Sequence, residues 1–350
     1  MNVLNFIQRI FELHMHDRLS LYKKCFQCPR KCGTDRTGKK TGVCGESKSI
    51  RIASACLHFG EEPLVTVYGG SGTVFFTGCT LKCAFCQNYQ IAQQGMGRDV
   101  SSDEFISICL KLQDAGAENI NLVTASHCIP KLAEYLRGAR RAGLTIPFCW
   151  NSSAYENVEM LELLRGTVTV WLPDLKTLSA ALAGRLFAAE DYPQTAVKAI
   201  LWMMEASPLK LVKKNSDGST KEKIQSGVII RHLFLPGRFE ETADTLDWLK
   251  HNADKKAVIS LMSQYTPVPF AGTEDELLKR KKALSAIENR LVTAEEYQDL
   301  KDLIEAYDFE YLFYQELSND TSWLPDFNRR QPFSNELARP FWHWKTGFCI

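Results

Sequence analysis

Residues 73–88 read Thr73-Val-Phe-Phe-Thr-Gly-Cys79-Thr-Leu-Lys-Cys83-Ala-Phe-Cys86-Gln-Asn, so three closely spaced cysteines follow a run of β-branched and aromatic residues. The run predicts a buried strand. Thiolates are soft ligands that select iron-sulfur clusters, zinc or copper(I), and this spacing lets one loop supply three of them. We therefore predict that Cys79, Cys83 and Cys86 bind a [4Fe-4S] cluster that is open at one iron. A zinc site completed by a distant cysteine, and buried thiols that bind no metal, are the alternatives.

Composition describes a globular protein without a strong overall charge. The chain has 350 residues, 45% of them hydrophobic, which suffices for one large α/β domain with appendages or for two modest domains. Its 42 Lys and Arg residues nearly balance its 41 Asp and Glu residues, so neither nucleic acid nor an anionic membrane is an expected partner. No basic leader precedes an apolar stretch, and no window approaches the ~18 apolar residues of a membrane span. These features predict a cytoplasmic protein.

A second group of cysteines has the spacing Cys25-x2-Cys28-x3-Cys32-x11-Cys44. Four soft ligands within twenty residues predict a closed metal site. Zinc and a second [4Fe-4S] cluster are both compatible with four thiolates, and the absence of any metal is the remaining alternative. A second cluster can pass electrons to the first, whereas zinc cannot. In a chain of this length, such clustered spacing indicates metal ligation in a reducing compartment rather than disulfides.

Between residues 73 and 270, short apolar runs alternate with longer amphipathic segments, which predicts repeated βα units and a parallel sheet. Ser101 and Glu104 form a capping-box pattern that opens the first helix. Six strands are predicted in this part, at residues 73–77, 119–124, 144–150, 167–175, 227–235 and 257–262. Six such units make a partial barrel, whose reactive groups lie at the C-terminal ends of the strands.

The flanking segments carry weaker patterns. Apolar residues at helical spacing predict an amphipathic helix over residues 2–22, and lysines around Asn215-Ser216-Asp217-Gly218 predict a flexible basic loop over 207–226. A capped helix is expected from Thr293 and a strand at 309–314, whereas prolines predict no regular structure in the aromatic terminal segment. We therefore expect four parts: an N-terminal helix (1–24), a Cys-rich metal-binding extension (25–72), the barrel (73–270) and a C-terminal α/β and aromatic extension (271–350).

The cysteine loop and several other motifs resemble the radical S-adenosylmethionine (SAM) superfamily. More narrowly, the chain resembles its group of pyruvate formate-lyase activating enzyme-like proteins. The other motifs are Cys25–Gly33, Leu57–Pro63, Asn119–Thr124, Pro173–Lys176 and Arg231–Leu233. This resemblance implies a partial (β/α)6 barrel, a [4Fe-4S] cluster, SAM, and a one-electron donor such as flavodoxin or ferredoxin. It also implies cleavage of SAM to a 5′-deoxyadenosyl radical that abstracts hydrogen from a substrate.

The resemblance also assigns residues to SAM. Phe85, which precedes the third cysteine, is expected beside the adenine, and Asn151 and Ser152 are expected at the ribose or methionine moiety. Asp174 and Lys176 match the Asp-x-Lys of glycyl-radical activating enzymes, where these groups surround the methionine end of SAM. An ordinary ion pair at the barrel rim is the alternative for this pair.

Two further positions complete the expected SAM site. Arg231 matches an arginine near the SAM carboxylate, and a guanidinium fork also suits a carboxylate physically. The Gly-Gly-Glu element that usually supports the methionine amino group is replaced by Thr124-Ala125-Ser126, which lacks the acid. Ser126 or Thr124 is expected to take its role. His127 follows directly, either as a proton donor or acceptor near the substrate or as a histidine of the core or rim.

Three hypotheses for function remain after these patterns. The first is hydrogen abstraction from a protein or peptide, as in glycyl-radical activation. The second is the same chemistry on a small molecule, because no motif specifies the substrate. The third comes from another class: a non-catalytic iron-sulfur or zinc protein that relays electrons or scaffolds a partner.

Overall fold

The computed structural model describes residues 19–216, 219–333 and 336–349. The helix predicted over residues 2–22 lies almost entirely outside these ranges. Its described end is a single 3-10 turn, η1 (Leu19–Tyr22). In the described ranges, no helix combines the length and the hydrophobicity that crossing a membrane requires.

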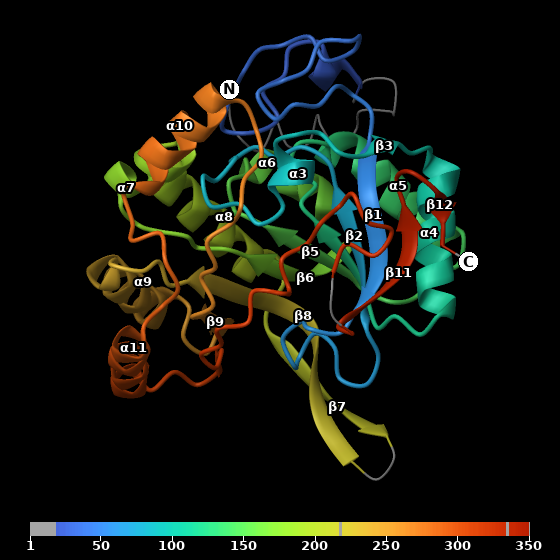
Figure 1. The fold of residues 1–350 in the computed structure, drawn as a ribbon. Helices are drawn as coiled ribbons and strands as arrows, with labels where there is room; N and C mark the ends of the chain where they lie inside the picture. Colours follow the sequence, from blue (N-terminus) through green and yellow to red (C-terminus); the bar gives the residue numbers. More distant parts are fainter. Residues whose placement is uncertain (1–18, 217–218, 334–335, 350) are drawn as a thin grey trace, which may run out of the picture.

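A run of parallel strands forms the centre of the fold (Figure 1). In spatial order these strands are β10 (Leu312–Tyr314), β9 (Val258–Met262), β8 (Ser219–Leu233), β6 (Val168–Pro173), β5 (Phe148–Ser152), β4 (Ile120–Val123) and β2 (Ser71–Phe76). The six predicted strands are confirmed, and so is the strand expected at 309–314, which extends the parallel run as β10. Strand β5 begins later than predicted because Gln113 accepts hydrogen bonds from the backbone N–H groups of Thr145 and Ile146.

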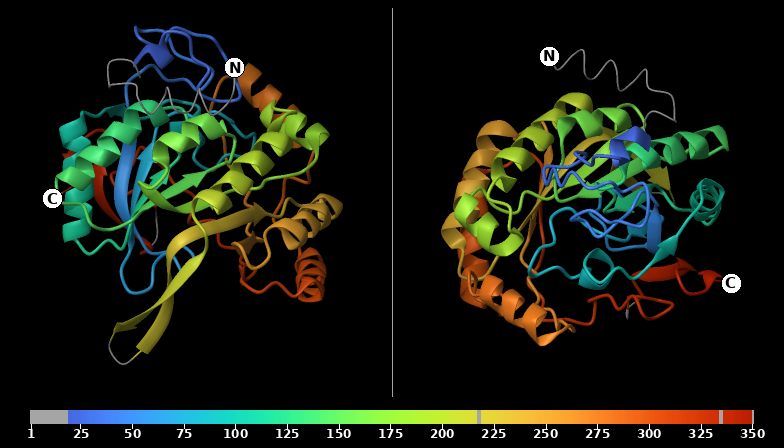
Figure 2. Two further views of the ribbon diagram at one scale, coloured as in Figure 1. Left: turned by 180° about the vertical axis from the view of Figure 1, so that it is seen from behind. Right: turned by 90° about the horizontal axis from the view of Figure 1, so that it is seen from above.

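Helices cover the outside of this sheet, as both views of Figure 2 show. They are α4 (Ser102–Asp114), α5 (Ile129–Arg141), α6 (Val158–Leu161) with η2 (Glu162–Leu164), α7 (Ala180–Phe187), α8 (Tyr192–Ala206) and α9 (Phe239–Asn252). The predicted N-cap of the first helix is confirmed, because the Ser101 hydroxyl accepts the Glu104 N–H at 3.1 Å. In the described structure the reciprocal half of the capping box is absent, because the Glu104 carboxylate accepts hydrogen bonds from Arg98 and Trp342 instead. Helix α4 buries Phe105, Ile108 and Leu112 beneath it, which anchors the helix to the sheet.

Antiparallel strands extend the sheet beyond β2. Strand β1 (Arg51–His58) pairs with β2, and β11 (Ala338–His343) pairs with β1 and β12 (Gly347–Phe348), while β3 (Arg98–Asp99) also pairs with β1. The prediction that the terminal segment lacks regular structure is therefore wrong for β11. Its Pro340 lies opposite Cys56, next to a register shift between Ala55 and Cys56, where a missing N–H is tolerated.

The expected basic loop over residues 207–226 is also wrong, because it forms a β-hairpin. Strand β7 (Lys210–Ser216) pairs antiparallel with the first part of β8, and the hairpin projects from the body (Figure 1). Ile224 is buried near its base, where its N–H donates to the Leu64 carbonyl at 3.0 Å. The sequence contains an Asp-Gly dipeptide at 217–218, a common signal for tight hairpins that the high lysine content obscured.

The C-terminal part adds two helices and a crossing segment. Helices α10 (Glu274–Leu284) and α11 (Ala294–Tyr307) both begin with complete capping boxes, which confirms the helix expected from Thr293. A crossing segment, residues 315–333 and 336–337, then passes in front of the parallel strands (Figure 1) before β11 begins. The short helix α3 (Tyr89–Ala92) follows the cysteine loop. The C-terminal part therefore contributes strands to the same sheet as the barrel.

Candidate functional site

The loop with Cys79, Cys83 and Cys86 leaves the C-terminal end of β2. The chain turns there through Gly78, at φ +84°, where a side chain would collide with the side chain of Glu46. Cys83 is buried, the other two thiols are partly exposed, and all three line one cavity. Within the loop, the Leu81 N–H donates to the Cys79 sulfur at 3.4 Å.

The surroundings of these thiols suit a cluster. Burial raises the pKa of the Cys83 thiol above its usual range and that of Cys86 to about 12, while the charge of Lys176 opposes both shifts. Metal binding must therefore release protons from them. The described residues that line the cavity include these three thiols and no fourth cysteine. Three soft donors beside an open space fit a [4Fe-4S] cluster with one iron free.

The cavity has a volume of about 650 Å³ and lies along the C-terminal ends of the parallel strands. Six of the eight residues expected at SAM line it together with the cysteines: Phe85, Thr124, Asn151, Asp174, Lys176 and Arg231. The structure thus brings together side chains from the ends of four strands, β4, β5, β6 and β8, and from the cysteine loop. Whether each one touches SAM remains a prediction.

The other two expected residues, Ser126 and Ser152, are buried behind the cavity wall. Their hydroxyls donate to Glu156 at 2.6 and 2.9 Å, and the indole N–H of Trp150 donates to it at 2.7 Å. Burial raises the pKa of Glu156, although these three hydrogen bonds oppose the shift. Sequence reasoning missed Glu156, because no spacing pattern connects it to partners on two neighbouring strands. Ser153 lines the cavity instead, and its hydroxyl has no hydrogen-bond partner among the described residues.

Asp174 and Lys176 form an ion pair in the cavity wall, with Nζ 2.7 Å from Oδ2. Burial opposes the charge of Lys176, but Asp174 and the Cys83 thiol raise its pKa above the usual range. Tyr192 fixes the turn between them, because its hydroxyl donates to the Asp174 carbonyl at 2.7 Å and accepts the Lys176 N–H at 2.9 Å. The pair therefore offers one acceptor and one donor at a fixed position beside the cysteines.

Arg231 binds two carboxylates from the Leu57–Pro63 segment. Its Nε and Nη2 lie 2.7 and 2.6 Å from the two oxygens of Glu62, and Nη2 lies 2.7 Å from Glu61. Although burial opposes ionisation, a hydrogen bond from His58 and the charge of Arg231 lower the pKa of Glu61 to about 2. The carboxylate expected beside Arg231 is thus supplied by this chain in the described structure, and the predicted contact with SAM stays a prediction.

Other polar atoms of the cavity wall lack partners among the described residues. They include Thr73 Oγ1 and Trp323 Nε1. Trp323 belongs to the crossing segment, which also contributes Phe333 and Leu337 to the wall. Buried polar groups are normally satisfied, so these atoms are suited to a bound ligand. His127 is not among the lining residues: it is buried, which lowers its pKa to about 3 and keeps it neutral.

The four N-terminal cysteines also lie together. A Cβ at Gly42 would lie 3.3 Å from the Cys32 sulfur and 3.4 Å from the Cys44 sulfur, and the Cys32 sulfur lies 3.9 Å from the Cys25 carbonyl oxygen. Burial raises the pKa of the Cys28 thiol to about 12, and the charges of the other three thiols add to this shift. Only Cys32 is partly exposed. Across the described ranges, no three His, Cys, Asp or Glu side chains are placed to hold a single metal ion, and this applies to both cysteine groups.

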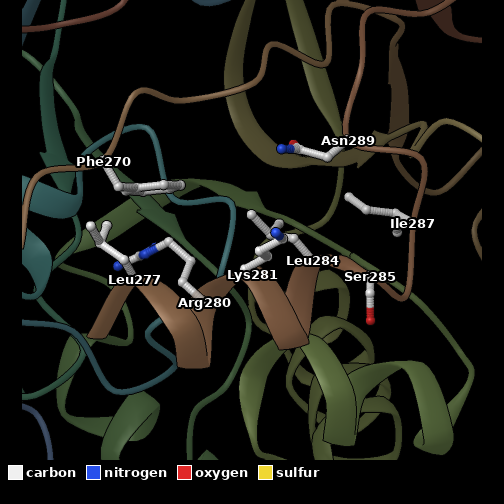
Figure 3. A pocket seen from close by; sticks show the side chains of 8 residues that line it. All are labelled: Phe270, Leu277, Arg280, Lys281, Leu284, Ser285, Ile287 and Asn289. Atoms are coloured by element: carbon white, nitrogen blue, oxygen red, sulfur yellow. The ribbon is translucent and has the colours of Figure 1, made fainter. Parts of the chain in front are cut away.

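A second cavity of about 440 Å³ lies between α10 and residues 285–289 (Figure 3). Arg280 of this cavity lies against the ring of Phe270, 3.6 Å from its centre, and donates to the Ala84 carbonyl at 2.7 Å. Helix α10 therefore contacts the cysteine loop directly. No residue that the sequence placed at SAM lines this second cavity.

A three-thiol loop at the open end of a partial parallel barrel defines a class of iron-sulfur enzymes. The sequence model of the radical SAM superfamily matches residues 73–249, slightly more than half of the chain. The protein therefore belongs to the radical SAM superfamily. Membership implies a [4Fe-4S] cluster and SAM, which agrees with the three thiols and the cavity beside them.

Among proteins of similar sequence is MJ0674 of Methanocaldococcus jannaschii, an uncharacterised protein that is 28% identical over 305 residues, 85% of this chain and 82% of that one. Similar solved structures include a radical SAM methyltransferase from Sphaerobacter thermophilus, with TM-score 0.47 and 14% identity over 72% of this chain and 68% of that one. Another is Streptococcus suis SuiB bound to its precursor peptide SuiA, with TM-score 0.44 and 13% identity over 68% of this chain. That alignment spans 46% of SuiB.

Proposed function

We propose that this protein is a hydrogen-abstracting radical SAM enzyme whose cluster is held by Cys79, Cys83 and Cys86. The observation that carries the proposal is the shared cavity, which collects these thiols with polar side chains from the adjoining strand ends. When bound, the cluster and SAM supply a one-electron cleavage that yields a 5′-deoxyadenosyl radical able to remove hydrogen from a substrate.

The residues of this chain bind and orient the reacting molecules. Asp174 and Lys176 present an acceptor and a donor that suit the amino and carboxylate groups of methionine. Phe85 provides an aromatic wall, which Phe187 and Tyr265 support with ring centres 6.0 and 6.1 Å away. Trp323 and Phe333 of the crossing segment line the cavity, and their aromatic rings reduce the access of water to reactive species.

The volume of the cavity supports a small-molecule substrate. Its volume of about 650 Å³ lies within the ~300–1,000 Å³ of typical small-molecule sites, and SAM must share it. A protein or peptide substrate, as in a glycyl-radical activase-like reaction, is the second candidate. The superfamily's chemistry is common to both candidates.

We also infer that the protein works in the reducing cytoplasm with a one-electron donor such as flavodoxin or ferredoxin. All twelve cysteines are free thiols in the described structure, which suits a reducing compartment. An electron donor is needed because the reductive cleavage of SAM consumes one electron in each reaction.

The test is anaerobic reconstitution of the full chain with iron and sulfide, followed by a strong chemical reductant and SAM. We expect 5′-deoxyadenosine, measured by liquid chromatography and mass spectrometry, and its complete loss in Cys83→Ala. Cys349→Ala is the matched control, because Cys349 does not line the cavity. A fully iron-loaded protein that forms no 5′-deoxyadenosine contradicts the proposal and favours an electron-relay or scaffold protein.

A further inference from the structure

We propose that Cys25, Cys28, Cys32 and Cys44 hold a second [4Fe-4S] cluster through which electrons reach the catalytic one. The inference rests on the proposed function, because it supplies the electron that SAM cleavage consumes. Three independent observations support it: the gathering of the thiols, an unpaired buried cation beside them, and direct contact with the catalytic loop.

The backbone of the N-terminal segment gathers the four thiols. The Cys25 carbonyl accepts the Gly33 N–H at 3.0 Å, which folds this part of the loop back on itself. Gly42 leaves room between two sulfurs, because a Cβ there would lie 3.3 Å from that of Cys32 and 3.4 Å from that of Cys44. Among the described residues, neither this group nor the three thiols of the catalytic loop are placed to hold a single metal ion. A cubane instead spreads its ligands over separate irons.

A buried arginine lies beside the thiols without a carboxylate partner among its hydrogen bonds. Arg36 is 1% exposed, and its Nη1 lies 3.4 Å from the Cys25 sulfur. Its remaining hydrogen bonds, of 2.7 to 2.9 Å, all go to the carbonyl oxygens of Glu46, Ser47 and His127. An uncompensated buried charge is strongly destabilising. Thiolates bound to a cluster provide the negative charge that this guanidinium needs.

The N-terminal segment also contacts the catalytic loop through the backbone. The Cys79 N–H donates to the Cys44 carbonyl at 3.2 Å, so one ligand of each site is joined by a hydrogen bond. Arg30 donates from Nε to the Thr80 carbonyl at 2.8 Å and from Nη2 to the Leu81 carbonyl at 3.0 Å. Zinc has no redox chemistry and gains nothing from such contact, whereas a cluster gains a short path for electrons.

The outer face of this segment suits the arrival of an electron carrier. Near the partly exposed Cys32, Phe26 and Val43 are 48% and 45% exposed. Exposed lysines surround them in sequence, namely Lys23, Lys24, Lys31, Lys39, Lys40 and Lys48, against one exposed acid, Asp35. This charge favours an acidic one-electron carrier. The carrier loses one electron, the N-terminal cluster accepts it and passes it to the catalytic cluster, and no bond or proton changes.

The first test counts metals in the full chain after anaerobic reconstitution. We expect about eight irons and no zinc in the natural protein, and about four irons in Cys28→Ala, in Cys44→Ala and in Cys83→Ala, because each cluster holds four. Cys349→Ala should retain eight. One zinc per chain, or an iron content that is unchanged in Cys28→Ala, overturns the inference.

The second test separates the relay from the catalytic site. With a strong chemical reductant, Cys28→Ala should still form 5′-deoxyadenosine, whereas Cys83→Ala should not. With a reduced acidic ferredoxin as donor, reduction of the catalytic cluster, followed by electron paramagnetic resonance, should be at least tenfold slower in Cys28→Ala. Equal rates in the natural protein and Cys28→Ala overturn the relay while leaving the proposed function intact.

A third variant covers the case in which loss of a cysteine unfolds the segment. Arg36→Gln removes the buried charge but none of the ligands. We expect it to keep eight irons and to shift the reduction potential of the N-terminal cluster to a lower value, because a positive charge favours the reduced state. An unchanged potential contradicts the role assigned to Arg36, and an iron content of about four in both the natural protein and Arg36→Gln contradicts the second cluster itself.

Discussion

Glu156 links two strand ends of the cavity wall through one buried side chain. It accepts hydrogen bonds from Ser126, Trp150 and Ser152, which lie on or directly after β4 and β5. Asn151 and Ser153, the neighbours of Ser152, face the cavity. Glu156 is therefore a positioning residue for this part of the wall, and the serines that resemblance assigned to SAM serve it in the described structure.

Substitution of Glu156 should expose this role. Glu156→Ala leaves three buried donors unpaired, so the free energy of unfolding should fall by about 3 kcal/mol or more. Glu156→Gln keeps an acceptor and should lose about 1 kcal/mol. Guanidinium denaturation of the iron-free protein measures both values. Equal stability of the two variants would show that the hydrogen bonds to Glu156 contribute little.

His232 should make the protein sensitive to mild acid. Its Nδ1 lies 2.7 Å from the Leu175 carbonyl and its Nε2 3.0 Å from the Thr242 hydroxyl, so the neutral tautomer protonated at Nδ1 satisfies both. Burial, assisted by the charge of Lys176, lowers its pKa from 6.5 to about 4. Between pH 6.5 and pH 4 the unfolded chain binds a proton at His232 more readily than the folded protein does. The contribution of neutral His232 to the free energy of unfolding is therefore fully present above pH 6.5 and is lost as the pH falls toward 4.

The free energy of unfolding should change with pH by up to about 1.4 kcal/mol per pH unit because of His232 alone. It is measured by denaturation between pH 7 and pH 4. In His232→Gln this contribution to the slope should disappear, although the variant starts from a lower stability. A slope that is identical in both proteins assigns the acid sensitivity to other groups.

Capping is the feature that unites the two C-terminal helices, but their burial differs. The Thr293 hydroxyl accepts the Glu296 N–H at 3.1 Å, and Glu296 accepts the Thr293 N–H at 3.0 Å. Helix α11 buries Leu300 and Ile304, whereas α10 buries only Leu284 among its residues. The same capping motif therefore begins one helix that packs on the core, α11, and one that is mostly exposed, α10.

Thr293→Ala should lower the free energy of unfolding by about 1 kcal/mol, the usual effect of losing such a cap. Thr273→Ala, which removes the matching cap of α10, should have a smaller effect because that helix packs less. Thermal unfolding of both variants provides the comparison. A larger loss in Thr273→Ala contradicts the assignment of stability to the packed face of α11.

At the scale of whole elements, patterns within a short window predicted the parallel strands and the capped helices well. Strand β1 and strand β11 were not expected, because each is stabilised by a partner far along the chain, such as Ser54 opposite His343. The hairpin of β7 and β8 was predicted as a loop because its many lysines suggested a solvated segment, although its residues can pair as two antiparallel strands. Lys213 in fact faces Glu222, which compensates part of that charge.

For the molecule as a whole, the exposed lysines of the N-terminal Cys-rich segment should attract an acidic electron carrier. Changing Lys31, Lys39 and Lys40 together to Glu should lower 5′-deoxyadenosine formation several-fold when an acidic ferredoxin is the donor. Formation with a strong chemical reductant should be unchanged. The physical reason is the loss of attraction between the segment and the carrier.

Raised salt should have the same effect on the natural protein, because charges on exposed surfaces are screened beyond about 10 Å at 0.1 M. Lys213→Glu with Lys214→Glu is the matched control, since these exposed lysines lie on the hairpin. An equal decrease in that control shows a general charge effect rather than docking at the N-terminal segment.

Short-range patterns in this chain sufficed for the grouping of three cysteines in one loop, the strand-and-helix alternation and the N-caps of the helices. In each case the responsible groups lie within a few residues, so local geometry links them directly. The partners of Arg231 and of Ser126 followed from no such pattern, because Glu62 and Arg231 are separated by 169 residues and Glu156 belongs to a different strand connection from Ser126. Folding alone determines which of several compatible charges and hydroxyls meet, since burial removes water as a competing partner and forces each polar group to find another.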